Sequence, residues 1–287
     1  MSLSDTPLPV WVNGRLMSAT DPAITVQDFG LLYGEGLFET MRARGGRIAY
    51  LDRHFTRLRE SAALIGLPLP GEEEMRQGLR VLLSEFPGEE RIYRVRLTVS
   101  RGCAGPFDRP TVVSPTVFIL ASPSTPPSSS WSAVWSPYRR DEAGPLSRVK
   151  STCYLPNVMA KRYAVAEGVE EALFLNTRGE IAEGSVSNLF LLNGEWLATP
   201  PEDSGLLPGI LRSVLLDRAA EIGLQAEEKP LSPDDLYGAD AAFLTNSVMG
   251  VVPLVKIGGR EIGGGRPHPK TEILRSLLWR PGDDHAP

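Results

Sequence analysis

The stretch that decides the fold is Val149-Lys150-Ser151-Thr152-Cys153-Tyr154-Leu155-Pro156-Asn157, which places a lysine just before a predicted helix. Two more stretches come later in the chain. The first is Glu183-Gly184-Ser185-Val186-Ser187-Asn188, and the second is Gly205-Leu206-Leu207-Pro208-Gly209-Ile210-Leu211-Arg212. An amine, a carboxylate and a helix start with unpaired backbone N–H groups therefore occur in this order.

Each of these features is weak when taken alone, because a single lysine is most often a solvated surface residue and Glu-Gly-Ser is most often a turn. Their order and spacing carry the inference. Together they provide what a pyridoxal phosphate site needs: an amine for the Schiff base, an acid for the ring nitrogen and a helix start for the phosphate.

The composition is that of an ordinary soluble globular protein. The chain has 287 residues, 42% hydrophobic and 23% charged, with a formal net charge of −5. This charge argues against a nucleic-acid partner or an anionic membrane surface, and no apolar run is long enough to span a membrane. Two cysteines and three histidines without clustered spacing predict neither a metal site nor a disulfide framework, which fits a reducing cytoplasm. The N-terminus lacks the pattern of a secretion signal.

A segment rich in serine, threonine and proline, residues 122–130, predicts an interdomain linker. It separates a small N-terminal domain, residues 8–121, from a larger C-terminal domain, residues 131–280, that is expected to carry Lys150. Both parts mix strands and helices, so the predicted fold class is α+β.

Two hairpins are predicted in the N-terminal part. Asn13-Gly14 follows a strand over 10–12, and Gly45-Gly46 separates strands over 37–44 and 47–51. Residues 93–100 alternate apolar and polar side chains, which predicts a half-buried strand. The other elements predicted here are a helix capped by Asp52 with Phe55, Leu58, Ala62 and Ile65 on one face, a helix over 72–85 and a strand over 116–121.

The C-terminal part alternates strands and helices more evenly, and Pro208 before Gly209 suits the start of a helix. The predicted strands cover 131–135, 171–176, 188–192, 195–198, 241–245 and 252–257, and the predicted helices cover 155–167, 209–222 and a short segment after Ser232.

With these residues in view, the chain resembles the class IV, fold type IV, pyridoxal phosphate enzymes. This family includes D-amino acid aminotransferases, branched-chain aminotransferases and 4-amino-4-deoxychorismate lyases. The resemblance covers residues 9–265, and the combination of EGS-x-SN with G-x-LPGI-x-R is its most specific part. It implies a two-domain fold with a small α/β N-terminal domain and a larger C-terminal domain with a mixed, barrel-like sheet.

The resemblance also implies roles for single residues. Lys150 would form the Schiff base and then shuttle protons, and Glu183 would keep the ring nitrogen protonated. Arg57 and Ser247 would bind the cofactor phosphate. The rest of the implied cofactor site consists of Ile210 and Leu211, through backbone N–H groups on the phosphate, Leu207 against the ring, and Ser187 and Asn188 beside Glu183.

Two positions are implied to meet the substrate. Phe38 stands where D-amino acid aminotransferases carry a tyrosine, and Phe38-Glu39-Thr40 replaces the Phe-Glu-Gly usual in branched-chain enzymes. Arg101, in Ser100-Arg101-Gly102, is the best candidate to bind a substrate carboxylate as a bidentate donor. Arg94 and Arg96 either add positive charge there or belong to a solvated sheet face. Cys153 stands where many relatives have asparagine, and no basic partner is evident that would make it a nucleophile.

Three hypotheses remain open. The first is a 4-amino-4-deoxychorismate lyase, favoured by Phe38-Glu39-Thr40, by Ser100-Arg101-Gly102 and by residues 245–250. The second is an aminotransferase for branched-chain or D-amino acids, which shares the first proton abstraction. The third is a binding protein that keeps the fold without catalysis, which intact Lys150 and Glu183 disfavour. In each enzymatic case the partner is a small amino or aminodeoxychorismate-type substrate, and the resemblance implies a homodimer.

Overall fold

The computed structural model describes residues 8–21, 23–86, 88–103, 114–280 and 282–287. The chain divides into two compact units, the first formed by residues 1–125, 150–153 and 281–287, and the second by residues 126–149 and 154–280. The change of unit at residues 125 and 126 falls inside the segment predicted as a linker. Lys150 was expected in the C-terminal domain, whereas residues 150–153 pack with the first unit.

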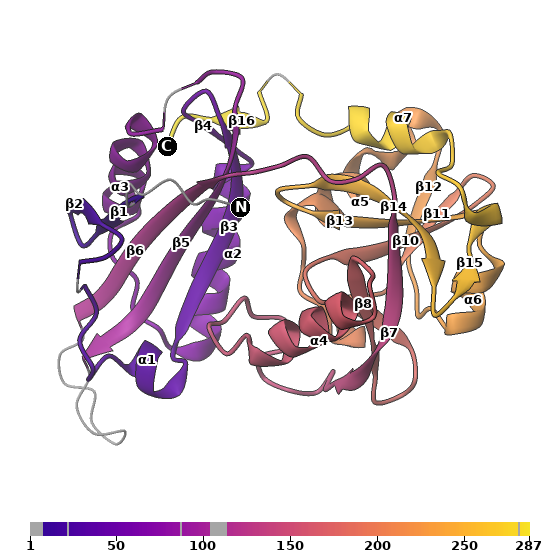
Figure 1. Cartoon of the computed structure of the whole chain (residues 1–287), viewed down its shortest axis with the longest axis horizontal. Helices are drawn as coiled ribbons and strands as arrows, with labels where there is room; N and C mark the ends of the chain where they lie inside the picture. The colour runs from indigo at the N-terminus through magenta and orange to yellow at the C-terminus, as the bar shows by residue number, and fades with distance from the viewer. Residues whose placement is uncertain (1–7, 22, 87, 104–113, 281) are drawn as a thin grey trace. The chain divides into compact units, whose positions relative to one another are not determined.

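The first unit is built on a seven-stranded antiparallel sheet with the order β16-β4-β3-β5-β6-β1-β2 (Figure 1). Its elements are β1 (Pro9–Val12), β2 (Arg15–Ser18), α1 (Phe29–Tyr33), β3 (Gly36–Arg44), β4 (Arg47–Ala49), α2 (Leu51–Ile65), α3 (Glu72–Ser84), β5 (Ile92–Cys103), β6 (Ser114–Pro123) and β16 (Asp284–His285).

Cross-strand pairing defines the two faces of this sheet, since residues directly opposite each other share a face. Glu39, Leu97, Ile119 and Trp11 form one row across four strands. Helix α3 packs on that side, because a side chain at its Gly78 would collide with the ring of Trp11. The neighbouring row, Phe38, Thr98, Phe118 and Val12, lies on the opposite face.

Both predicted hairpins are present, as β1–β2 and β3–β4. The prediction that Asp52 caps a helix is wrong, because that helix, α2, begins at Leu51 after Tyr50, whose φ of 53° is left-handed. Tyr50 is held there by Asp283, which accepts from its backbone N–H and its hydroxyl at 2.7 and 2.9 Å. Asp52 lies in the first turn instead and accepts from Arg76 at 2.5 Å. Helix α1, capped by Asp28, was not predicted.

The second unit is a nine-stranded mixed sheet with the order β12-β11-β10-β13-β14-β7-β8-β9, with β15 paired to β14. Strands β7 and β8, and β14 and β7, pair in parallel. Its elements are β7 (Trp131–Arg140), α4 (Leu155–Ala166), β8 (Glu171–Asn176), β9 (Ile181–Gly184), β10 (Asn188–Asn193), β11 (Trp196–Thr199), the 3-10 helix Glu202–Ser204, α5 (Ile210–Arg218), the 3-10 helix Ala219–Ile222, β12 (Gln225–Glu228), α6 (Pro233–Gly238), β13 (Ala241–Asn246), β14 (Gly250–Ile257), β15 (Arg260–Glu261), the 3-10 helix Gly263–Gly265 and α7 (Lys270–Ser276).

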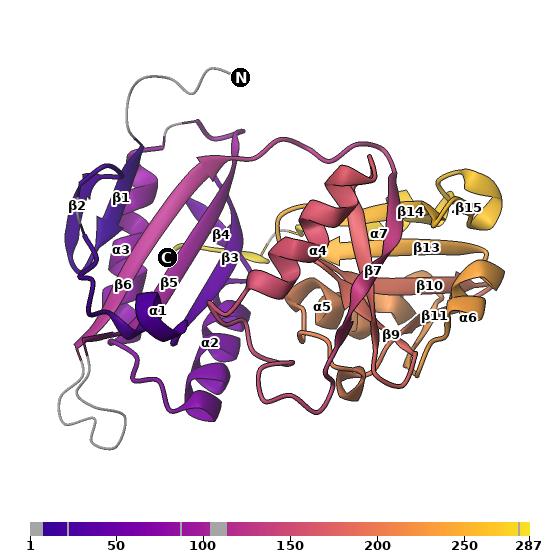
Figure 2. The same ribbon diagram turned by 60° about the horizontal axis from the view of Figure 1, so that its bottom comes forward.

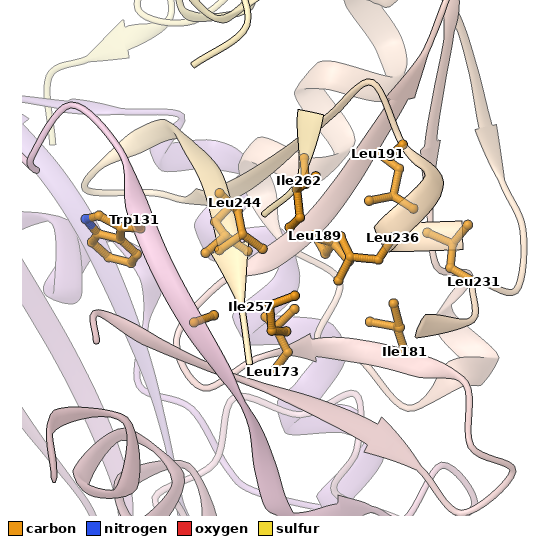
Figure 3. Close-up of a cluster of buried hydrophobic side chains, with 14 of the residues drawn as sticks. Trp131, Leu173, Ile181, Leu189, Leu191, Leu231, Leu236, Leu244, Ile257 and Ile262 are labelled. Carbon is orange, nitrogen blue, oxygen red and sulfur yellow. The ribbon is translucent and has the colours of Figure 1, made fainter. Parts of the chain in front are cut away.

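The sheet curls around a core of aliphatic side chains, among them Leu189, Leu244 and Ile257, each fully buried (Figure 3). Helix α4 lies along β7 and β8 (Figure 2). Small residues permit this close approach, since Ala160 and Ala164 pack with Phe174 in a second buried cluster. The predicted helix over 209–222 is divided into α5 and a 3-10 turn, and Glu183-Gly184 ends strand β9 rather than forming a turn.

No helix among the described residues is long and apolar enough to cross a membrane. Among the described residues, there is also no group of three or more histidine, cysteine or acidic side chains that could hold a metal ion.

Candidate active site

Backbone pairing holds Lys150 beside strand β3. The N–H of Phe38 donates to the carbonyl of Lys150 at 2.9 Å, and the N–H of Thr152 donates to the carbonyl of Gly36 at 2.9 Å. Between them, Leu37 and Ser151 form an antiparallel bridge. Strand β4 pairs only with the far end of β3, at Ala43 and Arg44, which leaves the first residues of β3 open to this pairing. These bonds are why the lysine belongs to the first unit.

The Phe38 ring contacts two cations. The Lys150 ammonium is 4.6 Å from the ring centroid, and the Arg96 guanidinium carbon is 3.6 Å from it. Both contacts have cation–π geometry. Thr40 lies directly opposite Arg96 on the neighbouring strand and therefore shares this face of the sheet. The neighbourhood of Lys150 is thus aromatic and positively charged, which suits a substrate carrying carboxylates.

On the opposite face of β3, Glu39 binds the two basic residues of α2 that face it. Its carboxylate accepts from Arg57 Nε at 2.9 Å and Nη2 at 2.5 Å, and it meets His54 Nδ1 at 2.6 Å. Burial alone would raise the pKa of Glu39, but the charge of Arg57 and the contacts with His54 lower it to about 2. Glu39 is therefore ionised and fixes the orientation of Arg57, the predicted phosphate ligand.

His54 is buried by the same cluster. Burial lowers its pKa, and the charges of Arg57 and Lys150 lower it further, although Glu39 acts in the opposite direction. The imidazole is consequently neutral near pH 7, with the Nδ1 proton donated to Glu39. Its Nε2 is buried and has no hydrogen-bond partner among the residues that the structure describes.

Arg101, the predicted carboxylate ligand, is already bound within the first unit. Its Nε donates to the Glu35 carboxylate, and its Nη2 donates to the carbonyl of Gly66 at 2.8 Å. Gly66 is the residue at which α2 ends. The structure brings Arg96 to the same Phe38 ring as Lys150, while Arg101 keeps its role only as a prediction.

In the second unit, Glu183 accepts two hydrogen bonds. Arg140 Nη2 donates to one carboxylate oxygen at 2.6 Å, and the backbone N–H of Leu207 donates to the other at 3.0 Å. The Arg140 guanidinium also stacks on Phe174, 4.4 Å from the ring centroid. Arg140 was missed by sequence reasoning, because it lies well before the Glu183 motif and only the fold brings the two together.

Asn188 completes the support of Leu207. Its amide donates to the Leu207 carbonyl at 3.0 Å, so that Glu183 and Asn188 hold both backbone groups of one residue. A Cβ at Gly209 would lie 1.9 Å from the Asn188 side-chain oxygen, which requires glycine at this position. The motifs 183–188 and 205–212 therefore form one hydrogen-bonded assembly.

Helix α5 begins directly after this assembly. Its N-cap is Gly209, no side chain caps it, and no acidic residue lies in its first turn. The backbone N–H groups of Ile210 and Leu211 at such a helix start suit an anion, which fits the predicted phosphate contact.

The two predicted serine contacts differ. Ser187 donates to Glu171 at 2.8 Å, so its hydroxyl is used in supporting its own loop. Ser247 lies in the turn after β13, which the Asn246 side chain closes by accepting from the N–H groups of Val248 and Met249. Cys153 is exposed and touches the carbonyl of Gly34 at 3.4 Å.

Comparison with known proteins agrees with this arrangement. Residues 36–257 match the family model described as amino-transferase class IV. The chain belongs to the class IV aminotransferase family. It is 36% identical to a Methanocaldococcus jannaschii protein provisionally assigned as a branched-chain-amino-acid aminotransferase, covering 93% of this chain and 94% of the other. It is 34% identical to the aminodeoxychorismate lyase of Bacillus subtilis, covering 94% and 93%.

Solved structures support the same assignment. The branched-chain amino acid aminotransferase of Escherichia coli superposes with a TM-score of 0.86 at 26% identity, covering 94% of this chain and 93% of the other. The predicted fold type IV, α+β architecture is thereby confirmed. The T.th. branched-chain amino acid aminotransferase, 26% identical with a TM-score of 0.85 over 95% and 93% of the two chains, was solved with pyridoxamine 5'-phosphate.

The protein is therefore a pyridoxal-phosphate-dependent enzyme of this family. The residues present fit that cofactor in each unit separately. The first unit supplies an amine beside an aromatic ring, and the second supplies a fixed carboxylate and an uncapped helix start.

We expect Glu39→Gln to lower the free energy of unfolding at neutral pH by about 3 kcal/mol, because the pKa of Glu39 falls from 4.5 to about 2 on folding. A lowered folded-state pKa stabilises the protein above pH 4.5, and this stabilisation is lost as the pH falls from 4.5 towards 2. Denaturant unfolding across this pH range measures the effect, with the exposed Glu60→Gln as control. If the free energy of unfolding depended on pH in the same way in the wild type and in Glu39→Gln, the lowered pKa of Glu39 would be contradicted.

We expect Gly209→Ala to weaken cofactor binding by about tenfold or more, ~1.4 kcal/mol, because the new Cβ would displace either Asn188 or the start of α5. Titration of the apoprotein followed by absorbance measures the dissociation constant. Gly238→Ala is the matched control, since a Cβ there meets no atom within 4 Å. Equal affinities of the two variants would remove this turn from the cofactor site.

Proposed function

We propose that the protein is a 4-amino-4-deoxychorismate lyase, which releases pyruvate and forms 4-aminobenzoate. The observation that carries the proposal is the charged face beside Lys150, where Arg96 and Lys150 share the Phe38 ring and Thr40 lies opposite Arg96. A substrate with two carboxylates suits this face. An aliphatic side chain would instead require an apolar surface, because burying it against an arginine leaves the charge desolvated.

In this proposal, the residues of the first unit act on the substrate. Lys150 would hold the cofactor covalently, and its amine would take the proton from the substrate ring carbon that bears the amino group. Arg96 binds a substrate carboxylate, and Arg57 binds the cofactor phosphate in the orientation set by Glu39. Breaking the carbon–oxygen bond then releases pyruvate, and the two products together contain all atoms of the substrate.

The residues of the second unit would hold the cofactor. Glu183 would accept from the ring nitrogen, Leu207 would pack against the ring, and the start of α5 with Ser247 would bind the phosphate. When bound, the cofactor withdraws electrons from the carbon that loses its proton. The fixed positions of Glu183 and Leu207, each held by hydrogen bonds, support these roles.

An aminotransferase is the second candidate, and the relatives favour it. Similar proteins include the Methanocaldococcus jannaschii protein provisionally assigned as a branched-chain aminotransferase at 36% identity, and a D-alanine and a branched-chain aminotransferase at 32 and 31%, beside the lyase at 34%. The same residues would take the first proton, and the two activities differ only in the steps after that proton transfer. The need for a keto acid acceptor therefore separates them.

A homodimer in the cytoplasm stays a proposal from the family resemblance. Helix α1 supports an association between copies, because Leu31, Leu32 and Tyr33 are 63, 52 and 51% exposed. Asp28 holds this short helix in place by accepting from Ser100 and Thr116 at 2.8 Å.

Purified, cofactor-loaded protein given 4-amino-4-deoxychorismate without any keto acid should release pyruvate and 4-aminobenzoate in equal amounts. Lys150→Ala should show no turnover, because no other group is proposed to take the proton. Both products are quantified by chromatography, and a panel of L- and D-amino acids with 2-oxoglutarate or pyruvate is assayed in parallel. Amino transfer without lyase products would replace the proposal with the second candidate, and an active Lys150→Ala would refute both.

Arg96→Leu should raise KM for 4-amino-4-deoxychorismate by about tenfold or more, because a charge-assisted hydrogen bond is worth ~1.5–3 kcal/mol. Arg94→Leu is the matched control, since Arg94 lies two residues away on the same strand and is exposed. Steady-state kinetics of both variants give the comparison. Similar KM values for the two variants would exclude Arg96 as the carboxylate ligand.

A further inference from the structure

We propose that Glu171 is a positioning residue, which fixes the loop 184–188 and thereby holds Glu183 at the ring nitrogen of the cofactor. The inference rests on the proposed role of Glu183. It concerns a residue that has no assigned contact with substrate or cofactor and acts through its neighbour.

Glu171, the first residue of β8, is fully buried. Its carboxylate accepts from three backbone N–H groups, those of Ala172, Ser185 and Val186, at 2.9, 3.2 and 3.4 Å. It also accepts from the hydroxyls of Ser185 and Ser187, the latter at 2.8 Å. Among the described residues, no basic side chain is one of its donors.

This arrangement is informative because a buried carboxylate without a cation is costly unless hydrogen bonds replace its hydration. Four of the five donors belong to the loop that follows Glu183. The loop is therefore held on Glu171, because opening it would leave buried carboxylate oxygens without donors, an energetic constraint that an apolar side chain would not impose.

The Glu171 carboxylate accounts for the residue types at three positions of the motif 183–188. Ser185 and Ser187 are its hydroxyl donors. A Cβ at Gly184 would lie 2.2 Å from the Ser187 hydroxyl and 3.0 Å from Glu171, so the position requires glycine. Ser187, predicted to contact the cofactor, donates to Glu171 and so supports the loop that follows Glu183.

The outer side of the loop is held by donors of a different kind. The carbonyl of Ser185 accepts from Asn157 at 2.8 Å and from the Tyr154 hydroxyl at 3.1 Å, and Asn246 donates to the carbonyl of Val186 at 3.2 Å. The N–H groups of Ser185 and Val186 thus face Glu171, that of Ser185 also donating to the Ala172 carbonyl at 2.9 Å, and the carbonyls of the same two residues face these side chains. A loop held on both sides leaves little freedom for Glu183, which directly precedes it.

Small displacements of Glu183 matter, because its oxygens must keep their contacts with Arg140 and Leu207 while meeting the ring nitrogen. Displacements of about 1 Å in a supporting shell are enough to impair catalysis severely. Glu171 is therefore expected to influence the charge state of the cofactor ring, rather than stability alone.

The test uses Glu171→Gln in the full-length, cofactor-loaded enzyme, with the exposed Glu167→Gln as control. The glutamine amide would place an NH2 group against backbone N–H donors, which are fixed in place, so one of the carboxylate's acceptor positions would be lost. We expect the pH midpoint of the visible cofactor band to shift in the direction produced by Glu183→Gln, and kcat to fall by about tenfold or more with KM little changed. A lower melting temperature with an unchanged midpoint and unchanged kcat would reduce Glu171 to a structural residue and overturn the proposal.

A double-mutant comparison tests whether Glu171 acts through Glu183. In the Glu183→Gln background, adding Glu171→Gln should shift the midpoint no further, and additive shifts would overturn the proposal. If Glu171→Gln fails to fold, Ser187→Ala removes a single donor and should give a smaller shift in the same direction; an unchanged midpoint in Ser187→Ala would then overturn it.

The spectroscopic result separates this inference from the proposed function. The midpoint is measured without substrate, so failure of the lyase assignment leaves it unaffected. An unchanged midpoint in Glu183→Gln alone would show that the role of Glu183 has failed, and the role of Glu171 with it. A shifted midpoint in Glu183→Gln with none in Glu171→Gln would refute Glu171 only.

Discussion

The pairing of residues 150–152 with the first residues of β3 is the interaction on which the site depends. Two backbone hydrogen bonds of 2.9 Å, at Phe38 and Gly36, place a segment from far along the chain beside this strand. Because the backbone makes these bonds, they hold the Lys150 backbone beside β3 whatever side chains its neighbours carry, and the Phe38 ring then contacts the amine. The pairing also brings Arg96 and Thr40 of the same sheet face into the surroundings of the amine.

Two buried carboxylates support the site by different physical means. Glu39 is paired with the cation Arg57 and holds it in a two-point contact, which fixes the orientation of the predicted phosphate ligand. Glu171 is surrounded by neutral donors, most of them from the loop that follows Glu183. The first arrangement orients a charge, whereas the second orders a segment of backbone. In both, a buried acid supports a residue that is predicted to bind the cofactor.

Much of the fold could be predicted from local patterns, because hairpins and half-buried strands are encoded by adjacent residues. The hairpin at Asn13-Gly14 and the alternating strand over 93–100 are examples, and both are present. The combined motifs around Lys150 and Glu183 were enough to predict the family and its cofactor. The surroundings of those motifs were not predictable, since the partners of Glu183 and Glu39 lie far away in the sequence. Arg101 shows the same limit, because nothing local indicates that Glu35 and Gly66 bind it. A glutamate within a mostly apolar strand, as at Glu39 and Glu171, was the one feature of the sequence that could have indicated a buried acid with distant partners.

Our central claim is that Lys150 is the residue that binds the cofactor covalently. Reduction of the cofactor-loaded protein with sodium borohydride, followed by proteolysis and peptide mass mapping, tests this directly. We predict a phosphopyridoxyl group on Lys150 and on no other lysine. The same group on a different lysine, or no modified peptide from a protein that carries the cofactor, would contradict this claim.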